Sequence, residues 1–402
     1  MPLCLERAGV VPLVVDITVS DIRGDSSLLS SLIPCVSRIS CLSLEGYPSI
    51  EAVAEDLPGL FAAPMSNLAS LELRQAIEPA ELFPLNEIPV PPVFQNVSNL
   101  KSLRLTRTPI YSTLFGVTSL VELKLTGYTN PFHFGVFIRF LASNINLEIV
   151  DLGIKFIEGS VWETPVQMTS LAHLRSLSIT CSEPIFAKGL LSCISLPPGI
   201  CLEVSCLQWT SLGMCLPSPP TNIHAALAPI TAIRFQAAPR EIRVSGNGGS
   251  LSFRCPQPQF WNPELHLFPT TSVREFHVDI APWTFTPAFF VSLFTRLPAL
   301  EILVVTNSTC WPTGLFDSLA GQPPLCPSLK TMAFFNCGLT PEAVEEFEGM
   351  VARRKGSTST WLYQVVIVSS TRALPDYTLV ERLKQHVPRV DVRMDDKLPD
   401  LS

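Results

Sequence analysis

The chain has 402 residues, with 35 Asp and Glu against 28 Lys and Arg, and its formal net charge is −7. Apolar residues make up 47% and charged residues 16%, which excludes a disordered chain, because disorder requires low hydrophobicity and high charge. The negative net charge gives no sign of the basic surface that nucleic-acid binding requires. No run of about 18 apolar residues is free of charge, so we expect no membrane span. Glu6 and Arg7 interrupt the apolar N-terminus, which argues against a signal peptide.

The 12 cysteines include no Cys-x-x-Cys pair. Cys35, Cys193 and Cys201 fall at apolar positions of expected helices and strands. This pattern predicts buried, reduced thiols in a protein of the cytoplasm or nucleus. An extracellular repeat receptor is the alternative, and a titration of free thiols distinguishes the two.

The N-terminal region begins with an expected buried strand at Val11–Ile17 and a brief helix at Leu28–Val36. After it the frame Leu-x-x-Leu-x-Leu recurs, and it is clearest at Leu100-x-x-Leu103-x-Leu105. Such frames begin at residues 39, 68, 100, 120, 147, 174, 230, 273, 300 and 329, and 200–204 supplies a further strand. Most of the gaps are close to the 20–29 residues of a leucine-rich repeat. The spacing therefore indicates a repeat protein.

Helical spacing of apolar residues predicts helices between several of these strands. The expected helices are 134–142, 185–194, 289–297, 341–355 and 379–386, and the last lies between strands at 365–368 and 390–393. Each unit is then one strand with one crossover, and right-handed crossovers stack the strands side by side. The predicted fold class is α/β: an irregular leucine-rich-repeat solenoid with a curved parallel sheet and with helices or loops on its convex side.

A Gly-rich turn, Gly246-Asn247-Gly248-Gly249, interrupts the repeats between the apolar stretches 241–244 and 251–253. Such a turn between two short strands is a strong hairpin signal. We therefore divide the chain into three parts. They are an N-terminal capping strand and helix (1–38), irregular repeats (39–355) with a hairpin insertion at about 240–254, and a C-terminal capping unit (356–402).

No catalytic motif is visible in the sequence. The chain lacks a Gly-rich phosphate loop, His-Glu-x-x-His and Gly-x-Ser-x-Gly, and its six histidines have no ligand spacing. Arg353-Arg354-Lys355 is too short for a nucleic-acid-binding stripe and is expected to be a solvated helix end. We therefore predict a binding protein and not an enzyme, with no catalytic residue, no cofactor and no metal. An enzyme whose site is built from distant residues is the alternative.

The candidate binding site follows from the alternation of strand side chains. Residues next to the buried leucines point to the opposite, concave face, where we expect a protein partner. The candidate residues are Arg104, Lys124, His277, Asp279, Ile302, Val304 and Phe335.

Two alternatives stay open for these residues. The charges of neighbouring strands, Glu72 with Arg104 and Lys124 with Asp151, can merely pair with one another. The three apolar candidates either form an exposed interface, or the C-terminal strands continue the sheet and a loop covers them.

The stretch Leu329-Lys-Thr-Met332-Ala-Phe334-Phe-Asn-Cys337 resembles a ribonuclease-inhibitor-type, cysteine-containing leucine-rich repeat. Cys337 stands where that family's Asn or Cys caps the strand. Elsewhere this position holds Tyr47, Ala76, Thr108, Tyr128 or Ser308, so we expect no ladder of side chains there.

The whole chain, from Leu5-Glu-Arg-Ala-Gly9 through Val11-Pro-Leu-Val-Val-Asp-Ile17 onward, is similar to the part that follows the F-box in fungal, mushroom-type F-box proteins. That resemblance implies the substrate-recruiting half of a cullin-type ubiquitin ligase. The F-box itself is not visible, so a Skp-type adaptor is expected as a partner only if an F-box lies upstream of Met1. A stand-alone repeat scaffold without a ubiquitin-ligase role is the alternative.

Overall fold

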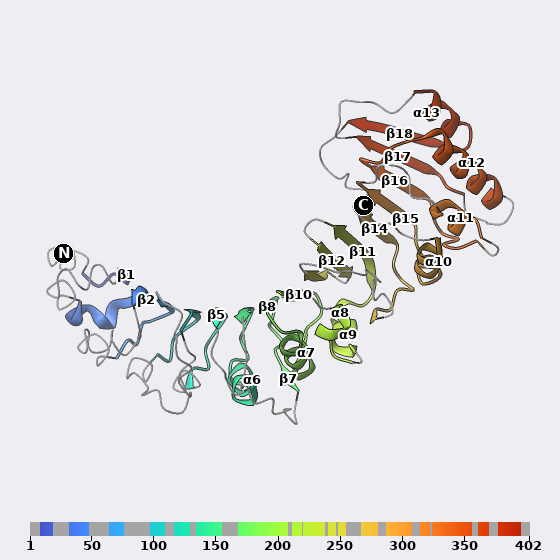
Figure 1. Ribbon diagram of the computed structural model, residues 1–402. Helices are drawn as coiled ribbons and strands as arrows, with labels where there is room; N and C mark the ends of the chain where they lie inside the picture. The colour runs from blue at the N-terminus through green and yellow to red at the C-terminus, as the bar shows by residue number, and fades with distance from the viewer. Residues whose placement is uncertain are drawn as a thin grey trace. The chain divides into compact units, whose positions relative to one another are not determined.

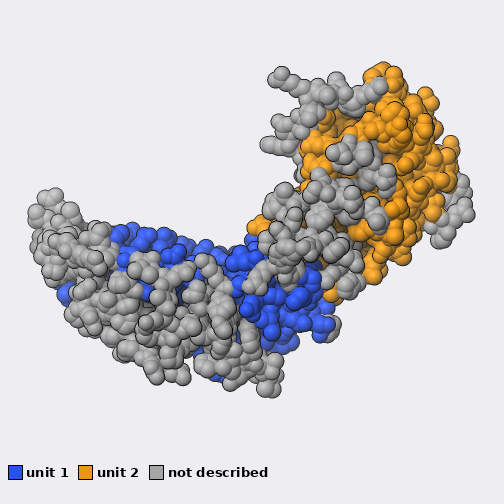
Figure 2. All heavy atoms as spheres, viewed as in Figure 1, with its two compact units in different colours: residues 1–223 blue, residues 224–402 orange. Residues whose placement is uncertain are grey.

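The computed structural model divides the chain into two compact units, residues 1–223 (unit 1) and residues 224–402 (unit 2), which Figure 2 colours separately. The described residues are 9–18, 32–47, 64–75, 97–108, 116–128, 134–154, 168–207, 211–218, 220–237, 240–246, 248–254, 267–279, 287–307, 314–321, 324–355, 361–369 and 377–394.

Unit 1 is built on a parallel sheet whose described strands pair in the order β1-β2-β3-β4-β5-β6-β8-β10 (Figure 1). They are β1 (Leu13–Thr18), β2 (Ile39–Tyr47), β3 (Ser70–Gln75), β4 (Ser102–Thr106), β5 (Glu122–Tyr128), β6 (Ile149–Ile154), β8 (Ser176–Cys181) and β10 (Cys201–Cys206). Two short strands, β7 (Thr169–Ser170) and β9 (Ile194–Ser195), pair with each other. Every strand that the sequence predicted in this unit is confirmed. The first was expected to be buried, which is wrong for one side of it, because Val14 is 69% exposed.

The repeated frame has the same local structure along the sheet. The backbone N–H of its first leucine closes a turn before the strand. The Leu100 N–H, for example, donates to the Val97 carbonyl at 3.1 Å, and the first leucine of three further frames in unit 1 makes the equivalent hydrogen bond. The second and third leucines, Leu103 and Leu105, are buried on one side of the strand. Because side chains alternate along a strand, the residues between them face the other way.

A residue in the left-handed conformation stands at or just after the end of several strands. Gly46, Arg107, Gly127, Asn307 and Asn336 each stand two places after the third apolar residue of a frame, and each has a positive φ. Glycine adopts this conformation at no steric cost and asparagine at a small one. The backbone can therefore turn out of the sheet at the same place in each of these repeats.

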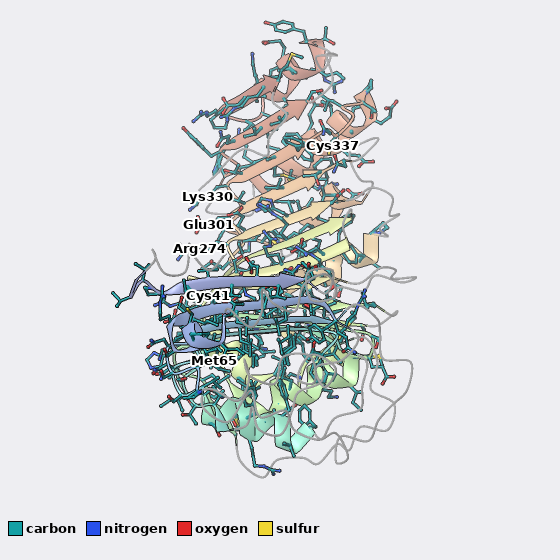
Figure 3. All side chains as sticks on the ribbon, turned by 90° about the vertical axis from the view of Figure 1, so that its left-hand side faces the viewer. Cys41, Met65, Arg274, Glu301, Lys330 and Cys337 are labelled. Carbon is teal, nitrogen blue, oxygen red and sulfur yellow. The ribbon has the colours of Figure 1, made fainter. Side chains whose placement is uncertain are left out.

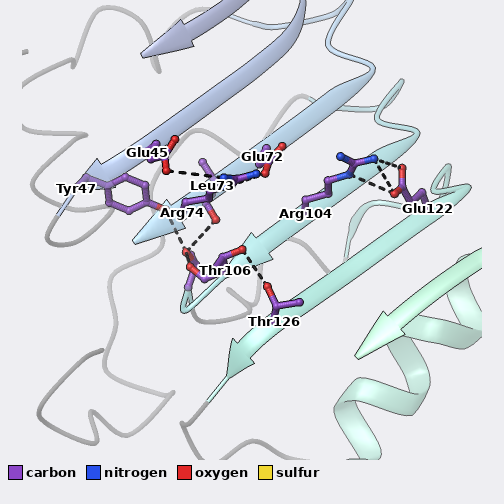
Figure 4. Close-up of polar contacts among 10 residues, drawn as sticks. Glu45, Tyr47, Glu72, Leu73, Arg74, Arg104, Thr106, Glu122 and Thr126 are labelled. Carbon is purple, nitrogen blue, oxygen red and sulfur yellow. Dashed lines mark hydrogen bonds and ion pairs between the residues drawn. The ribbon is translucent and has the colours of Figure 1, made fainter. Parts of the chain in front are cut away.

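At two repeats the next position approaches the preceding strand, while the expectation that the full ladder is missing stays a prediction. The Thr108 hydroxyl lies 3.4 Å from the Leu73 carbonyl and 3.1 Å from the Thr106 carbonyl, and the Cys337 sulfur lies 3.5 Å from the Val305 carbonyl and 3.4 Å from the Phe335 carbonyl. The Leu73 and Val305 carbonyls hold the same place on the preceding strand. Tyr47 also shares a hydrogen bond of 3.1 Å with Thr108, drawn in Figure 4.

Helices lie on one side of the sheet in unit 1 (Figure 1). They are α6 (Phe134–Ser143), α7 (Pro184–Cys193), α8 (Leu212–Cys215) and α9 (Thr221–Leu227), which ends four residues into unit 2, with a short 3-10 helix at Ile33–Arg38. The helices predicted at 134–142 and 185–194 are confirmed. Of the helix expected at Leu28–Val36, residues 28–31 lie outside the described residues.

Unit 2 has a mixed sheet with the strand order β13-β12-β11-β14-β15-β16-β17-β18. The strands are β11 (Ile230–Ala237), β12 (Arg240–Gly246), β13 (Gly249–Arg254), β14 (Glu275–Asp279), β15 (Ile302–Thr306), β16 (Thr331–Phe335), β17 (Gln364–Ser369) and β18 (Arg389–Met394). From β11 through β14 to β18 every pair is parallel.

The hairpin predicted at 240–254 is confirmed, and it belongs to the sheet. Gly246 lies opposite Gly249, and β12 is antiparallel to both β13 and β11. β12 therefore runs against its neighbours in an otherwise parallel sheet, because a tight turn reverses the chain where a crossover would keep its direction. The proposed boundaries at residues 38 and 355 stay a prediction.

The helices of unit 2 are α10 (Pro287–Thr295), α11 (Leu315–Leu319), α12 (Pro341–Lys355) and α13 (Tyr377–Lys384). Figure 1 shows them on one side of the strands. The ring of Phe316 packs against two other rings. Its centroid lies 5.5 Å from that of Phe347 on α12 and 6.2 Å from that of Phe334 on β16. The three helices predicted in this unit are confirmed, whereas α11 has too few residues to show a helical period.

One residue of the expected solvated helix end is buried instead. Arg354 is 4% exposed, and its guanidinium donates to the carbonyls of Leu319, Leu325 and Cys326 at 2.8–3.0 Å. Burial lowers the pKa of Arg354 from its ordinary value. Its neighbours Arg353 and Lys355 are exposed, as the sequence predicted.

Candidate partner-binding faces

The sheet of unit 1 has a polar face opposite its buried leucines. Its central row consists of in-register neighbours, Asp16, Ser43, Glu72, Arg104, Lys124, Asp151, Ser178 and Glu203. Every one of these side chains is exposed or half-buried. We call this row and the rows on either side of it the open face of unit 1.

Ion pairs link the strands across this face, and Figure 4 draws those around Arg74 and Arg104. Arg74 pairs with Glu72 on its own strand at 2.6 Å, and Arg104 pairs with Glu122 at 2.9 Å. Glu72 does lie opposite Arg104, as expected, but no ion pair joins them in the described structure, because each has a nearer partner.

Lys124 pairs with Asp151 at 2.7 Å, as predicted. Arg104 and Lys124, the two candidate residues of unit 1, therefore both lie on the open face with a carboxylate beside them. Exposed pairs of this kind contribute about 0–1 kcal/mol. An incoming partner can exchange them for its own contacts at little cost.

The corresponding face of unit 2 differs, because its centre is apolar and buried. Val304 is 0% and Phe335 is 8% exposed, and they form a cluster with Ala333, Val366 and Val368, against which Ile302 packs. The alternative of an exposed apolar interface is therefore wrong. The C-terminal strands β17 and β18 do continue the sheet, as the other alternative required. A partner role for these side chains stays an untested prediction.

The other two candidates, His277 and Asp279, lie beside this cluster on β14. His277 is directly opposite Val304, and Asp279 is opposite Thr306. The structure thus places the five candidates of unit 2 on three neighbouring strands of one face. His277 is 5% exposed, and its Nε2 is bonded to the Glu275 carboxylate.

A buried carboxylate organises the hairpin end of the same face. Glu241 accepts hydrogen bonds from the Ser252 hydroxyl and from Arg243, whose nitrogen is 2.9 Å away, and Arg254 lies at 3.7 Å. Burial raises the pKa of Glu241, but the hydrogen bonds and the arginine charges outweigh burial and hold the pKa below its ordinary value. The candidates chosen from the sequence do not include this group, although the hairpin register brings all four residues to one face.

This carboxylate makes the stability of unit 2 pH-dependent. The folded pKa of Glu241 lies below the unfolded value of about 4.3, so its contribution is complete above that value and is lost as the pH falls through the folded pKa. We expect Glu241→Gln to destabilise the protein by about 2 kcal/mol at pH 7 and by less at pH 3. Urea unfolding of both proteins across this range measures the difference. Glu345→Gln, at an exposed position of α12, is the control, and a constant difference for Glu241→Gln would contradict the assignment.

A line of charges marks one edge of unit 2, where β14, β15 and β16 begin. Glu301 lies 3.0 Å from Lys330 and 3.9 Å from Arg274, and Figure 3 shows the three along this edge. The side chains are exposed or half-buried. The Glu301 carboxylate pairs with both cations at this edge of the sheet.

Three cysteines of unit 1 lie close together. The Cys206 sulfur is 3.6 Å from that of Cys181 and 3.2 Å from that of Cys215, and all three residues are buried. A hydrogen bond with Cys206 and burial raise the pKa of Cys181. In the described part of the chain, no group of three or more His, Cys, Asp or Glu residues is arranged to hold a metal ion.

We expect purified protein to contain free thiols that react in the order of their exposure. No disulfide joins any two of the nine described cysteines. Cys201 is exposed, whereas burial raises the pKa of Cys326 to about 12, so Cys201 should be alkylated much faster. Mass spectrometry after brief labelling of native protein, and after labelling in denaturant, measures the order. Early labelling of Cys326, or a disulfide at Cys206, would contradict it.

The repeated frame, the shared turns and the sheet with helices on one side define an irregular leucine-rich-repeat protein of the α/β class in both units. No protein-family model and no curated protein matches the chain. Among solved structures, the chain is similar to a leucine-rich-repeat protein of Leptospira interrogans, with 13% identity and a TM-score of 0.35, over 97% of this chain and 98% of that one. No helix in the described ranges is long and apolar enough to cross a membrane.

Proposed function

We propose that the chain is a non-enzymatic scaffold that binds a protein partner on the open face of unit 1. The observation that carries the proposal is the in-register polar row across β1 to β10, whose side chains are all exposed or half-buried. The exposed ion pairs of this sheet contribute little stability, so a partner protein can replace them with its own contacts at a small cost in free energy. Free thiols support a reducing compartment, the cytoplasm or nucleus.

Obstruction of the open face tests this proposal. Ser178→Tyr places a large ring in the centre of the row, and tyrosine is well tolerated in strands. Ser195→Tyr, at an exposed position of β9, is the matched control. Quantitative mass spectrometry of proteins crosslinked to each bait in cells is the measurement. A partner captured by the wild type and the control, and lost with Ser178→Tyr, supports the proposal, whereas an unchanged partner set overturns it.

A finer form of the proposal makes the chain the substrate-recruiting half of a fungal F-box protein. Its support is the resemblance of residues 5–17 and of the repeats that follow them. The coding sequence upstream of Met1 and a pull-down with a Skp-type adaptor test this form. Without an F-box and without adaptor binding, the scaffold function stands and the ubiquitin-ligase role is dropped.

A further inference from the structure

A row of residues runs along the edge of unit 2 where β14, β15, β16 and β17 begin. Arg274, Glu301, Lys330 and Tyr363 each stand one place before one of these strands, and Figure 3 labels the first three. Backbone hydrogen bonds of 2.8–2.9 Å link them in this order, each N–H donating to the carbonyl of the preceding member. Because neighbouring strands lie about 4.8 Å apart, the row spans about 14 Å.

Two aromatic side chains lie exposed at the end of this row. Trp361 is 52% and Tyr363 is 56% exposed, while Leu362 between them is buried. The Lys355 ammonium, at the end of α12, lies 4.9 Å from the centre of the Trp361 ring, close enough for a cation–π interaction. Tryptophan and tyrosine are enriched at protein interfaces. We call the following residues the basic rim: Arg274, Glu301, Lys330, Lys355, Trp361 and Tyr363.

Cations outnumber carboxylates on the basic rim. The Glu301 carboxylate is shared by Lys330 at 3.0 Å and Arg274 at 3.9 Å. Lys355 is exposed, and no carboxylate within the described ranges pairs with it. The rim therefore has two positive charges in excess, although the chain as a whole has a net charge of −7.

The charged groups on either side of the rim do not remove this excess. On β14, Glu275 adds one negative charge even where its partner His277 is neutral. On β18, Asp391 is shared by Arg389 at 2.9 Å and Arg393 at 3.7 Å, which adds one positive charge. The two contributions cancel, so the rim stays positive.

We propose that the basic rim binds an extended acidic segment of a partner protein. Carboxylates of the segment pair with Lys330 and Lys355, and an apolar side chain between them packs on the exposed Trp361 ring. At about 3.3 Å per residue, four or five extended residues match the length of the row. The rim lies wholly in unit 2, so it is a second binding surface and does not require the open face of unit 1.

The charge pattern favours a protein segment over a nucleic acid. Single-stranded nucleic acid also stacks on aromatic rings, but its backbone carries a charge at every nucleotide and is bound by a stripe of clustered cations. The rim supplies two excess charges and places Glu301 between its cations. A segment with a few spaced carboxylates avoids that carboxylate more easily than a continuous phosphate backbone does.

Fluorescence anisotropy of the full chain with a labelled octapeptide of alternating Glu and Pro tests the rim. Proline keeps this probe extended and packs well on aromatic rings. We expect the Glu-Pro peptide to bind at least tenfold more tightly than the matching Gln-Pro peptide. The difference should shrink as salt is added, because exposed charges are screened.

A pair of double variants isolates the charges of the rim. Lys330→Gln with Lys355→Gln should abolish the preference for the Glu-Pro peptide. Lys101→Gln with Arg175→Gln is the matched control, because these two exposed residues stand directly before β4 and β8 of unit 1 and the same charge is removed. The control should bind as the wild type does. All four side chains are exposed, so the melting temperatures should stay close to that of the wild type.

A second pair of variants isolates the aromatic contact. Trp361→Ala should weaken binding of the Glu-Pro peptide several-fold, whereas Tyr377→Ala, which removes a 71% exposed ring from α13, should leave it unchanged. A smaller loss with Trp361→Ala than with Tyr377→Ala would show that the rim is not the contact.

Three further outcomes would overturn the proposal: equal binding of the Glu-Pro and Gln-Pro peptides, wild-type affinity of the rim double variant, or tighter binding of a labelled oligothymidylate than of the Glu-Pro peptide. Ser178→Tyr lies on the open face of unit 1 and should bind the Glu-Pro peptide as the wild type does. A failure of the rim therefore leaves the proposed scaffold function in place, and the two failures are distinguishable.

Discussion

Replacing Arg354 with methionine should lower the free energy of unfolding by about 3 kcal/mol. The arginine is buried on α12 and donates to three carbonyls, those of Leu319, Leu325 and Cys326. Methionine fills much of the same volume but donates no hydrogen bond, and it leaves buried acceptors that each cost about 1–3 kcal/mol. Methionine also removes the cost of burying a charge, which offsets part of this destabilisation.

The adjacent Arg353 is the control for this prediction. It is exposed and pairs with Asp317 at 2.7 Å, so Arg353→Met should change the stability by less than about 1 kcal/mol. Urea unfolding followed by circular dichroism measures both variants. Equal effects would mean that the three carbonyl contacts of Arg354 do not stabilise unit 2.

The repeats could be predicted from the sequence because their signal is local. A strand with one buried side repeats every second residue, and three apolar positions such as Leu100, Leu103 and Leu105 fix both the strand and the preceding turn. The left-handed residue near the strand end also has a local signal at Gly46 and Gly127, where glycine matches the positive φ.

Buried polar residues were not predictable in the same way. Asn144 is fully buried, where its side chain accepts from the Leu120 N–H and donates to the carbonyls of Val117 and Phe140. Its partners are backbone groups up to 27 residues away. Backbone groups carry no side-chain signal, so neither Asn144 nor Arg354 could be distinguished from a surface residue.

The burial of the apolar candidates, which the sequence analysis left open, has a visible cause. In β4, Ser-Leu-Arg-Leu-Thr alternates, whereas β15 is Ile-Leu-Val-Val-Thr and β17 is Gln-Val-Val-Ile-Val-Ser. A nearly continuous apolar run is typical of a parallel strand that is buried on both faces. The two units therefore differ in how their sheets are covered, and the sequence carries that difference strand by strand.

Val304→Asp should destabilise the protein by about 4 kcal/mol, as much as a charge placed among the leucines of the other face. Val304 is 0% exposed and packs with Ala333 and Val366 on the neighbouring strands. Ala333 and Val366 cannot pair with a carboxylate, and the His277 ring opposite Val304 is already bonded to the Glu275 carboxylate. The new charge would therefore be buried beside another negative charge, at a cost of about 3–5 kcal/mol. Phe335→Ala should cost about 3 kcal/mol through the cavity it leaves.

Val291→Asp separates burial from the chemistry of the substitution. Val291 lies on α10 of the same unit and is 46% exposed, so the same change there should cost less than about 1 kcal/mol. Thermal unfolding of the three variants is the measurement. If Val304→Asp and Phe335→Ala melt with the wild type, the row is not core, and an interface at these residues is restored as the better explanation of their apolar character. If both melt early, these side chains belong to the core and the partner site lies elsewhere.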